Sequence, residues 1–71
     1  MTAELRTLTI NGQRMEVPDG TTIAAFLEMH NLQPKSVVVE VNRIIIERES
    51  YAGTVLDEGD VVEIVRFIGG G

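Results

Sequence analysis

Three consecutive glycines, Gly69, Gly70 and Gly71, close the sequence directly after the apolar residue Ile68. Glycine has no side chain, so a tail of this kind fits a narrow channel and lets another backbone approach closely. Its useful group is the carboxylate of Gly71, which becomes reactive when an enzyme converts it into a mixed anhydride with a nucleotide phosphate. A sulfur or amine nucleophile can then attack the carbonyl carbon. The alternative interpretation of the same residues is a frayed chain end.

The composition gives little support to other kinds of chemistry. The 71 residues include no Cys and one His, which excludes disulfides, Cys-based zinc or iron–sulfur sites and a cysteine nucleophile. His30 is better explained as a helix-end residue than as a catalytic base. Tyr51 is better explained as a loop anchor, and the acidic run 57–60 as a turn rather than a metal site. We therefore expect no catalytic residue and no metal or cofactor bound by the chain itself.

The charge balance is acidic, since eleven Asp and Glu residues and six Lys and Arg residues give a formal net charge of −5. This argues against nucleic acid as a partner, because nucleic-acid binders carry basic patches, and it permits attraction to a basic partner surface. The longest apolar runs, 37–39 and 44–46, are far too short to span a bilayer. The N-terminal stretch lacks the features of a signal peptide. We expect a cytoplasmic protein that does not bind membranes.

The tail needs a folded body to carry it. The length predicts one small domain over residues 1–68, followed by a flexible glycine tail at 69–71. An Asn-Gly pair at 11–12 stands between two stretches of alternating apolar and polar residues, 7–10 and 14–17. This pattern predicts a β-hairpin with a two-residue turn, because Asn and Gly both tolerate positive φ.

The next stretch predicts a helix of about ten residues. Its side chains recur with the spacing of one helical face at Ile23, Phe26, Leu27 and His30. Thr21 or Thr22 can cap the start of this helix, and Asn31 and Pro34 can end it. Such an amphipathic helix should lie across a sheet.

Three more strands are expected, at 36–42, 43–47 and 60–68. The segment 48–59 has the composition of a loop, and Leu56 within it should insert into the core. The order of these elements predicts an α+β fold, with a mixed sheet of four to five strands and one main helix packed on one face.

Period-2 alternation divides the last strand into an inner set, Val62 and Ile64, and an outer set, Val61, Glu63, Val65 and Phe67. Glu63 belongs in water, which places Val65 and Phe67 on the open face of the sheet, where Val38 could join them. A register with Phe67 inside is the alternative. Ordering three glycines costs about 3–6 kcal/mol, so the folded body should add contact area. We therefore expect Val65, Phe67 and Ile68 to bind the partner.

From about Leu8 to Gly71 the chain resembles the ThiS family of thiamine-biosynthesis sulfur carriers, in the stretches LTINGQRMEVPDGTTIAAFL, VVVEVNRIIIERESY and TVLDEGDVVEIVRFIGGG. The resemblance implies a β-grasp, ubiquitin-like fold. It also implies that a ThiF-type adenylyltransferase uses ATP to adenylate the carboxylate of Gly71, and that a sulfur-relay enzyme then converts it to a thiocarboxylate. A ThiG-type thiazole synthase would receive that sulfur. Gly71 is then the modified residue, and Gly70 must fit the enzyme's tunnel.

Two positions depart from the usual family pattern. This chain has Arg43 where the family often has Gly after the Asn of its VNG turn. It has Glu47 close to the place where the family often has Pro. Both departures affect the expected loop conformation rather than the tail.

Other functions stay open at the level of sequence. The small subunit of molybdopterin synthase, and carriers that serve cysteine or tRNA, would share the fold, the tail and the thiocarboxylate. A protein modifier joined to lysines, as ubiquitin is, would use the same activation. A pure interaction domain of this fold would leave the tail idle, and an enzyme is the poorest match.

Overall fold

The computed structural model describes residues 4–67. Within them the chain forms, in order, β1 (Leu5–Ile10), β2 (Gln13–Pro18), α1 (Ile23–Met29), the 3-10 helix η1 (Pro34–Ser36), β3 (Val37–Val41), β4 (Ile44–Ile46), the 3-10 helix η2 (Arg48–Gly53) and β5 (Val61–Arg66). The strands form one five-stranded sheet in the order β2-β1-β5-β3-β4. β1 and β5 are parallel, and the other neighbours are antiparallel. The predicted α+β fold with a mixed sheet is confirmed.

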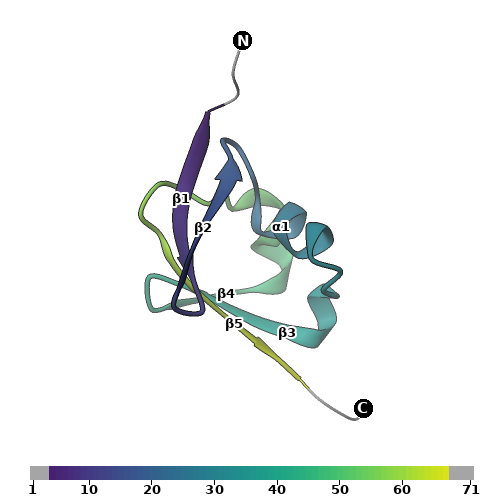
Figure 1. Ribbon diagram of the computed structural model, residues 1–71. Coiled ribbons are helices and arrows are strands. Elements are labelled where there is room, and N and C mark those ends of the chain that lie inside the picture. Colours follow the sequence, from purple (N-terminus) through teal and green to yellow (C-terminus); the bar gives the residue numbers. More distant parts are fainter. Residues whose placement is uncertain (1–3, 68–71) are drawn as a thin grey trace.

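One face of this sheet is covered. α1 and η2 lie on the same side of it (Figure 1), and the core fills the space between. The buried apolar side chains come from every strand but β4: Leu8, Ile10, Val17, Ile23, Phe26, Leu27, Val37, Val39, Tyr51, Leu56 and Val62. Among residues 4–67 no helix covers the opposite face, which is therefore the surface on which partners can be sought.

Both hairpins turn through two residues whose first member is Asn. Asn11 and Gly12 join β1 to β2 with φ of +50° and +83°, and Asn42 and Arg43 join β3 to β4 with φ of +51° and +71°. Positive φ at both turn positions matches the right-handed twist of the flanking strands. The first turn is the predicted one. The second keeps this geometry with Arg43 at a position that favours glycine.

α1 is shorter than the sequence predicts, at seven residues rather than about ten. Thr22 caps its start, because its Oγ1 accepts a hydrogen bond from the backbone N–H of Ala25 at 3.0 Å. The helix ends at Met29 because Asn31 adopts φ +57°, a left-handed conformation that Asn tolerates and that stops a helix. The chain thus turns before it reaches Pro34.

The segment before β5 contributes two core residues from irregular backbone. The stretch predicted as a loop begins as η2, which buries Tyr51, and Leu56 is 1% exposed. The N–H of Leu56 donates to the carbonyl of Thr21 at 2.9 Å. The N–H of Ile23 donates to the carbonyl of Thr54 at 3.0 Å. These bonds tie the segment to the start of α1, and the predicted insertion of Leu56 into the core is confirmed.

Leu56→Ala should lower the free energy of unfolding by about 2–5 kcal/mol, because it removes a buried side chain and leaves a cavity. The adjacent Val55→Ala is the matched control. Val55 is 53% exposed, so its loss should change stability by no more than about 0.5 kcal/mol. Chemical denaturation of the full chain measures both variants. Equal losses would show that Leu56 does not anchor the loop in the core.

Candidate functional site

β5 leads into the glycine tail, and it lies in the middle of the sheet between β1 and β3. On the β1 side, the N–H of Thr9 donates to the carbonyl of Asp60 and the N–H of Asn11 to the carbonyl of Val62, both at 2.9 Å. On the β3 side, pairing continues one residue beyond β5, because the N–H of Phe67 donates to the carbonyl of Ser36 at 2.8 Å. The folded body therefore holds the chain up to Phe67.

Asn11 holds β5 from the side of β1. Its Oδ1 accepts the N–H of Ile64 at 2.8 Å, and its Nδ2 donates to the carbonyl of Ile64 at 3.2 Å. One side-chain amide supplies both the acceptor and the donor that a neighbouring strand residue would offer. The short parallel pairing of β1 with β5 is thereby extended beyond the end of β1.

Asn42 holds β5 from the side of β3. Its Oδ1 accepts the N–H of Val61 at 2.9 Å, and its backbone N–H donates to the carbonyl of Val61 at 2.7 Å. Its Nδ2 donates to Oδ1 of Asp60 at 3.0 Å, and Oδ2 of Asp60 accepts the N–H of Asp57 at 2.8 Å. The acidic run 57–60 is thus the predicted turn, and the Asp60 carboxylate is used to close it.

We call these two contacts, from Asn11 to Ile64 and from Asn42 to Val61, the asparagine clamps. The sequence placed Asn11 and Asn42 at turns, and it gave neither side-chain amide a partner in β5. The available signal is that each Asn directly follows a strand and opens a two-residue turn. It does not say which distant strand the amide reaches.

Asn11→Gly and Asn42→Gly should each lower the free energy of unfolding by about 1–3 kcal/mol. Glycine accepts positive φ at least as well as Asn, so the loss would report the missing side-chain amide. Hydrogen exchange should also accelerate at the amide of Ile64 in the first variant and of Val61 in the second.

Asn31→Gly is the matched control for both substitutions. Asn31 also has positive φ, at +57°, but its side chain makes no hydrogen bond to any residue in the range 4–67. Its substitution should leave exchange in β5 unchanged. If all three variants behave alike, the clamps do not hold the strand.

The outer face of β5 carries the predicted docking residues. Val65 and Phe67 are 58% and 57% exposed, whereas Val62 is buried and Ile64 is half-buried on the inner face. The predicted outward register is confirmed, and the alternative that buries Phe67 is wrong. Val38 lies directly opposite Val65 on β3 and is half-buried, so it shares the face of the two exposed residues, as expected, without being fully exposed itself.

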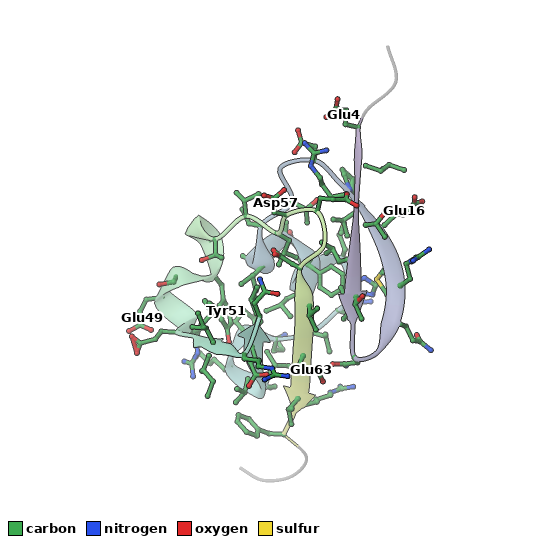
Figure 2. The ribbon with its side chains drawn as sticks, turned by 90° about the vertical axis from the view of Figure 1, so that its left-hand side faces the viewer. Glu4, Glu16, Glu49, Tyr51, Asp57 and Glu63 are labelled. Atoms are coloured by element: carbon green, nitrogen blue, oxygen red, sulfur yellow. The ribbon has the colours of Figure 1, made fainter. Side chains whose placement is uncertain are left out.

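Two carboxylates border these apolar residues, since Glu40 lies directly opposite Glu63. Figure 2 shows Glu63 on β5. Like charges directly opposite in a sheet are destabilising, and the ion pairs found within residues 4–67 all involve Arg6 rather than this pair. We define the outer patch as Val38, Glu40, Glu63, Val65 and Phe67. It suits a partner that offers apolar side chains beside a basic one.

The other residues considered from the sequence have structural places. His30 is exposed at the C-terminal cap of α1, and its ring packs on Phe26 with the centroids 4.3 Å apart, in agreement with a helix-end residue. In the part of the chain that the structure describes, no cluster of His, Asp or Glu could hold a metal ion. Nor does any helix there have the length and apolar character needed to cross a membrane.

The predictions for Ile68 and the three glycines cannot be read from this geometry. Ile68, Gly69, Gly70 and Gly71 lie outside the described residues. The predicted boundary between a domain at 1–68 and a tail at 69–71 therefore also falls outside them. What the structure defines is the point from which they start, which is Phe67.

The strand order, the parallel pairing of β1 with β5 and the one α-helix that residues 4–67 place across the sheet define a β-grasp, ubiquitin-like protein. Comparison with known proteins goes further. The model of the ThiS family matches residues 1–71. The sulfur carrier protein ThiS of Bacillus subtilis is 42% identical over 65 residues, which cover 90% of this chain and 98% of that protein. The chain belongs to the ThiS family.

Solved structures and longer relatives agree with this assignment. The crystal structure of the thiamine biosynthesis protein ThiS from Geobacter metallireducens superposes with a TM-score of 0.77 at 34% identity, covering 92% of this chain and 99% of that one. A thiazole synthase of Magnetococcus marinus is 39% identical over 62 residues, or 87% of this chain. The chain spans only 19% of that protein's length. The family and the β-grasp fold expected from the sequence are confirmed.

Proposed function

We propose that the chain is a sulfur carrier of thiamine biosynthesis whose reactive group is the carboxylate of Gly71. The family match over residues 1–71 supports this class of protein. The observation that carries the proposal is the position of β5, a central strand that is hydrogen-bonded up to Phe67, four residues before Gly71. A body built in this way can present a short, slim chain end to an enzyme.

In the proposed reaction a ThiF-type adenylyltransferase binds ATP together with the tail. A carboxylate oxygen of Gly71 attacks the α-phosphorus, which gives an acyl adenylate and releases pyrophosphate. A sulfur nucleophile at the oxidation level of sulfide, delivered by a sulfur-relay enzyme, then attacks the carbonyl carbon. The bond from that carbon to the AMP oxygen breaks and AMP leaves. One carboxylate oxygen is thereby replaced by sulfur, and the partner enzyme, not this chain, consumes the ATP.

The outer patch is the proposed docking surface for that enzyme. Four residues reach at most about 14 Å, so the catalytic centre must come within this distance of Phe67 and its surface must approach the patch. Ordering the tail costs about 1–2 kcal/mol per residue. Burial of Val65 and Phe67, with Ile68 as a further contact, would offset that cost.

A ThiG-type thiazole synthase is the proposed recipient of the sulfur. The thiazole synthases of Magnetococcus marinus and Paramagnetospirillum magneticum each contain a stretch similar to this chain, which amounts to 19% and 20% of their length. A carrier-like segment within the same polypeptide would deliver sulfur locally, which supports thiazole synthase as a partner. A cytoplasmic location, where ATP is at hand, belongs to the same proposal.

A variant that lacks Gly70 and Gly71 should fold normally and acquire no sulfur. Intact-mass spectrometry of the chain taken from thiamine-starved cells should show a species heavier by one oxygen-to-sulfur exchange, and the variant should lack it. Removal of Thr2 and Ala3 is the matched control and should leave the heavier species in place. If the full chain never gains that mass, the proposal fails. Sulfur transfer with the large subunit of molybdopterin synthase, and none with thiazole synthase, would assign the carrier to the other pathway.

Val65→Asp and Phe67→Asp should each raise the KM of the adenylyltransferase for the carrier about tenfold or more, because they place a charge in the proposed contact. The thermal midpoint should fall only modestly, since both side chains are exposed, although the new carboxylates share a face with Glu40 and Glu63. The matched control is Val55→Asp, at an exposed residue bridged to Thr22 beside the start of α1. ATP–pyrophosphate exchange measures the effect. Unchanged kinetics in the two patch variants would move the docking surface elsewhere.

A further inference from the structure

Among the described residues 4–67, β4 is a free edge of the sheet, because in the order β2-β1-β5-β3-β4 it pairs only with β3. It consists of three isoleucines, Ile44, Ile45 and Ile46. Ile44 and Ile45 point to opposite faces, and each is 64% exposed. An apolar edge strand of this kind is a template for pairing with another strand, and proteins usually blunt such edges with proline or inward-pointing charges.

The hydrogen-bonding groups of the edge can be assigned from the turn. Asn42 and Arg43 form a two-residue loop, so Val41 and Ile44 are the hydrogen-bonded pair that closes it. Pairs alternate along an antiparallel ladder, so the N–H and carbonyl of Ile45 point away from β3. They face the open edge, with no strand beyond them in the part of the chain described by the structure.

Two residues of opposite charge flank β4, each two positions along the chain from Ile45. Arg43 precedes β4 and Glu47 follows it, and both are exposed. Neither takes part in the ion pairs found between residues 4 and 67, all of which involve Arg6. Glu47 has extended backbone, with φ −73° and ψ 148°, so the chain stays strand-like for one residue beyond Ile46. An edge with a positive end and a negative end is complementary to itself when the second strand runs antiparallel.

We propose that β4 pairs antiparallel with β4 of a second copy of this chain, about a twofold axis midway between the two Ile45 residues. In this register the outward-pointing N–H and carbonyl of Ile45 bond to those of Ile45 in the other copy. Ile44 then lies opposite Ile46. Arg43, in the turn just before Ile44, comes beside Glu47 of the other copy at each end of the paired strands. A shift of two residues would break both charge pairs, so the charges select this register.

The pairing leaves the sulfur-carrying part of the molecule accessible. β3 separates β4 from β5, so the outer patch and the chain end at Phe67 are not covered. The two sheets become one, with both α1 helices on the same face and both outer patches on the other. Because a three-residue edge buries less than the about 1,200–2,000 Å² of a typical stable interface, the dimer is a weak one that forms at high concentration.

Sedimentation equilibrium of the full chain from about 20 μM to about 1 mM tests the pairing. The weight-average mass should rise from the monomer value of 7.8 kDa toward twice that value. Arg43→Glu and Glu47→Arg each create two like-charge pairs across the dimer and should weaken association about tenfold. The double variant, R43E with E47R, exchanges the two charges and should restore it.

Arg14→Glu is the matched control, since it makes the same charge change as R43E on β2, at the opposite edge of the sheet. It should leave the dimer intact. In the wild type, the amide of Ile45 should become more protected from hydrogen exchange as concentration rises. A mass that stays monomeric at 1 mM, equal weakening by R14E and R43E, or a double variant as weak as the single ones would each overturn the pairing. None of these outcomes bears on sulfur transfer, which a monomer can perform.

Discussion

The placement of one strand by two side-chain amides is the constraint on which the rest of this molecule depends. β5 leads toward Gly71, the residue proposed to react, and its parallel partner β1 is registered with it over only two residue pairs. The amides of Asn11 and Asn42 extend that contact on both sides of the strand. Since both asparagines also form the hairpin turns, any shift of a hairpin would move the base of the tail.

The outer face of the sheet shows a conflict between stability and recognition. A Glu40–Glu63 pair directly opposite each other weakens the sheet, and exposed Val65 and Phe67 add nothing to the core. Both features make sense if a partner with basic and apolar side chains covers them. The opposite face of the sheet packs against α1 and η2 (Figure 1), and the buried apolar side chains there stabilise the fold.

Much of the fold follows from local patterns in the sequence. Asn-Gly between alternating runs predicted the first hairpin, and alternation in β5 predicted that Val65 and Phe67 point outward. Asn31 was predicted to end α1 and does so by adopting a left-handed conformation, but the helix stops at Met29 and is shorter than the expected ten residues. The clamps and the Glu40–Glu63 pair were missed. Each depends on the register between strands far apart in sequence, and no local pattern encodes that register.

Because β1 pairs in parallel with β5, the native sheet can form only after β5 is present. The amide contact from Asn11 to Ile64 spans 53 residues, and the one from Thr7 to Glu58 spans 51. Such long-range contacts cost loop-closure entropy before they contribute stability, which slows folding. Until β5 arrives, β1 and β3 have no common neighbour, so a chain interrupted during synthesis cannot complete its sheet. Assembly of the native state is therefore coupled to the presence of β5, and a chain that ends before β5 would be exposed to proteases as an unfolded one.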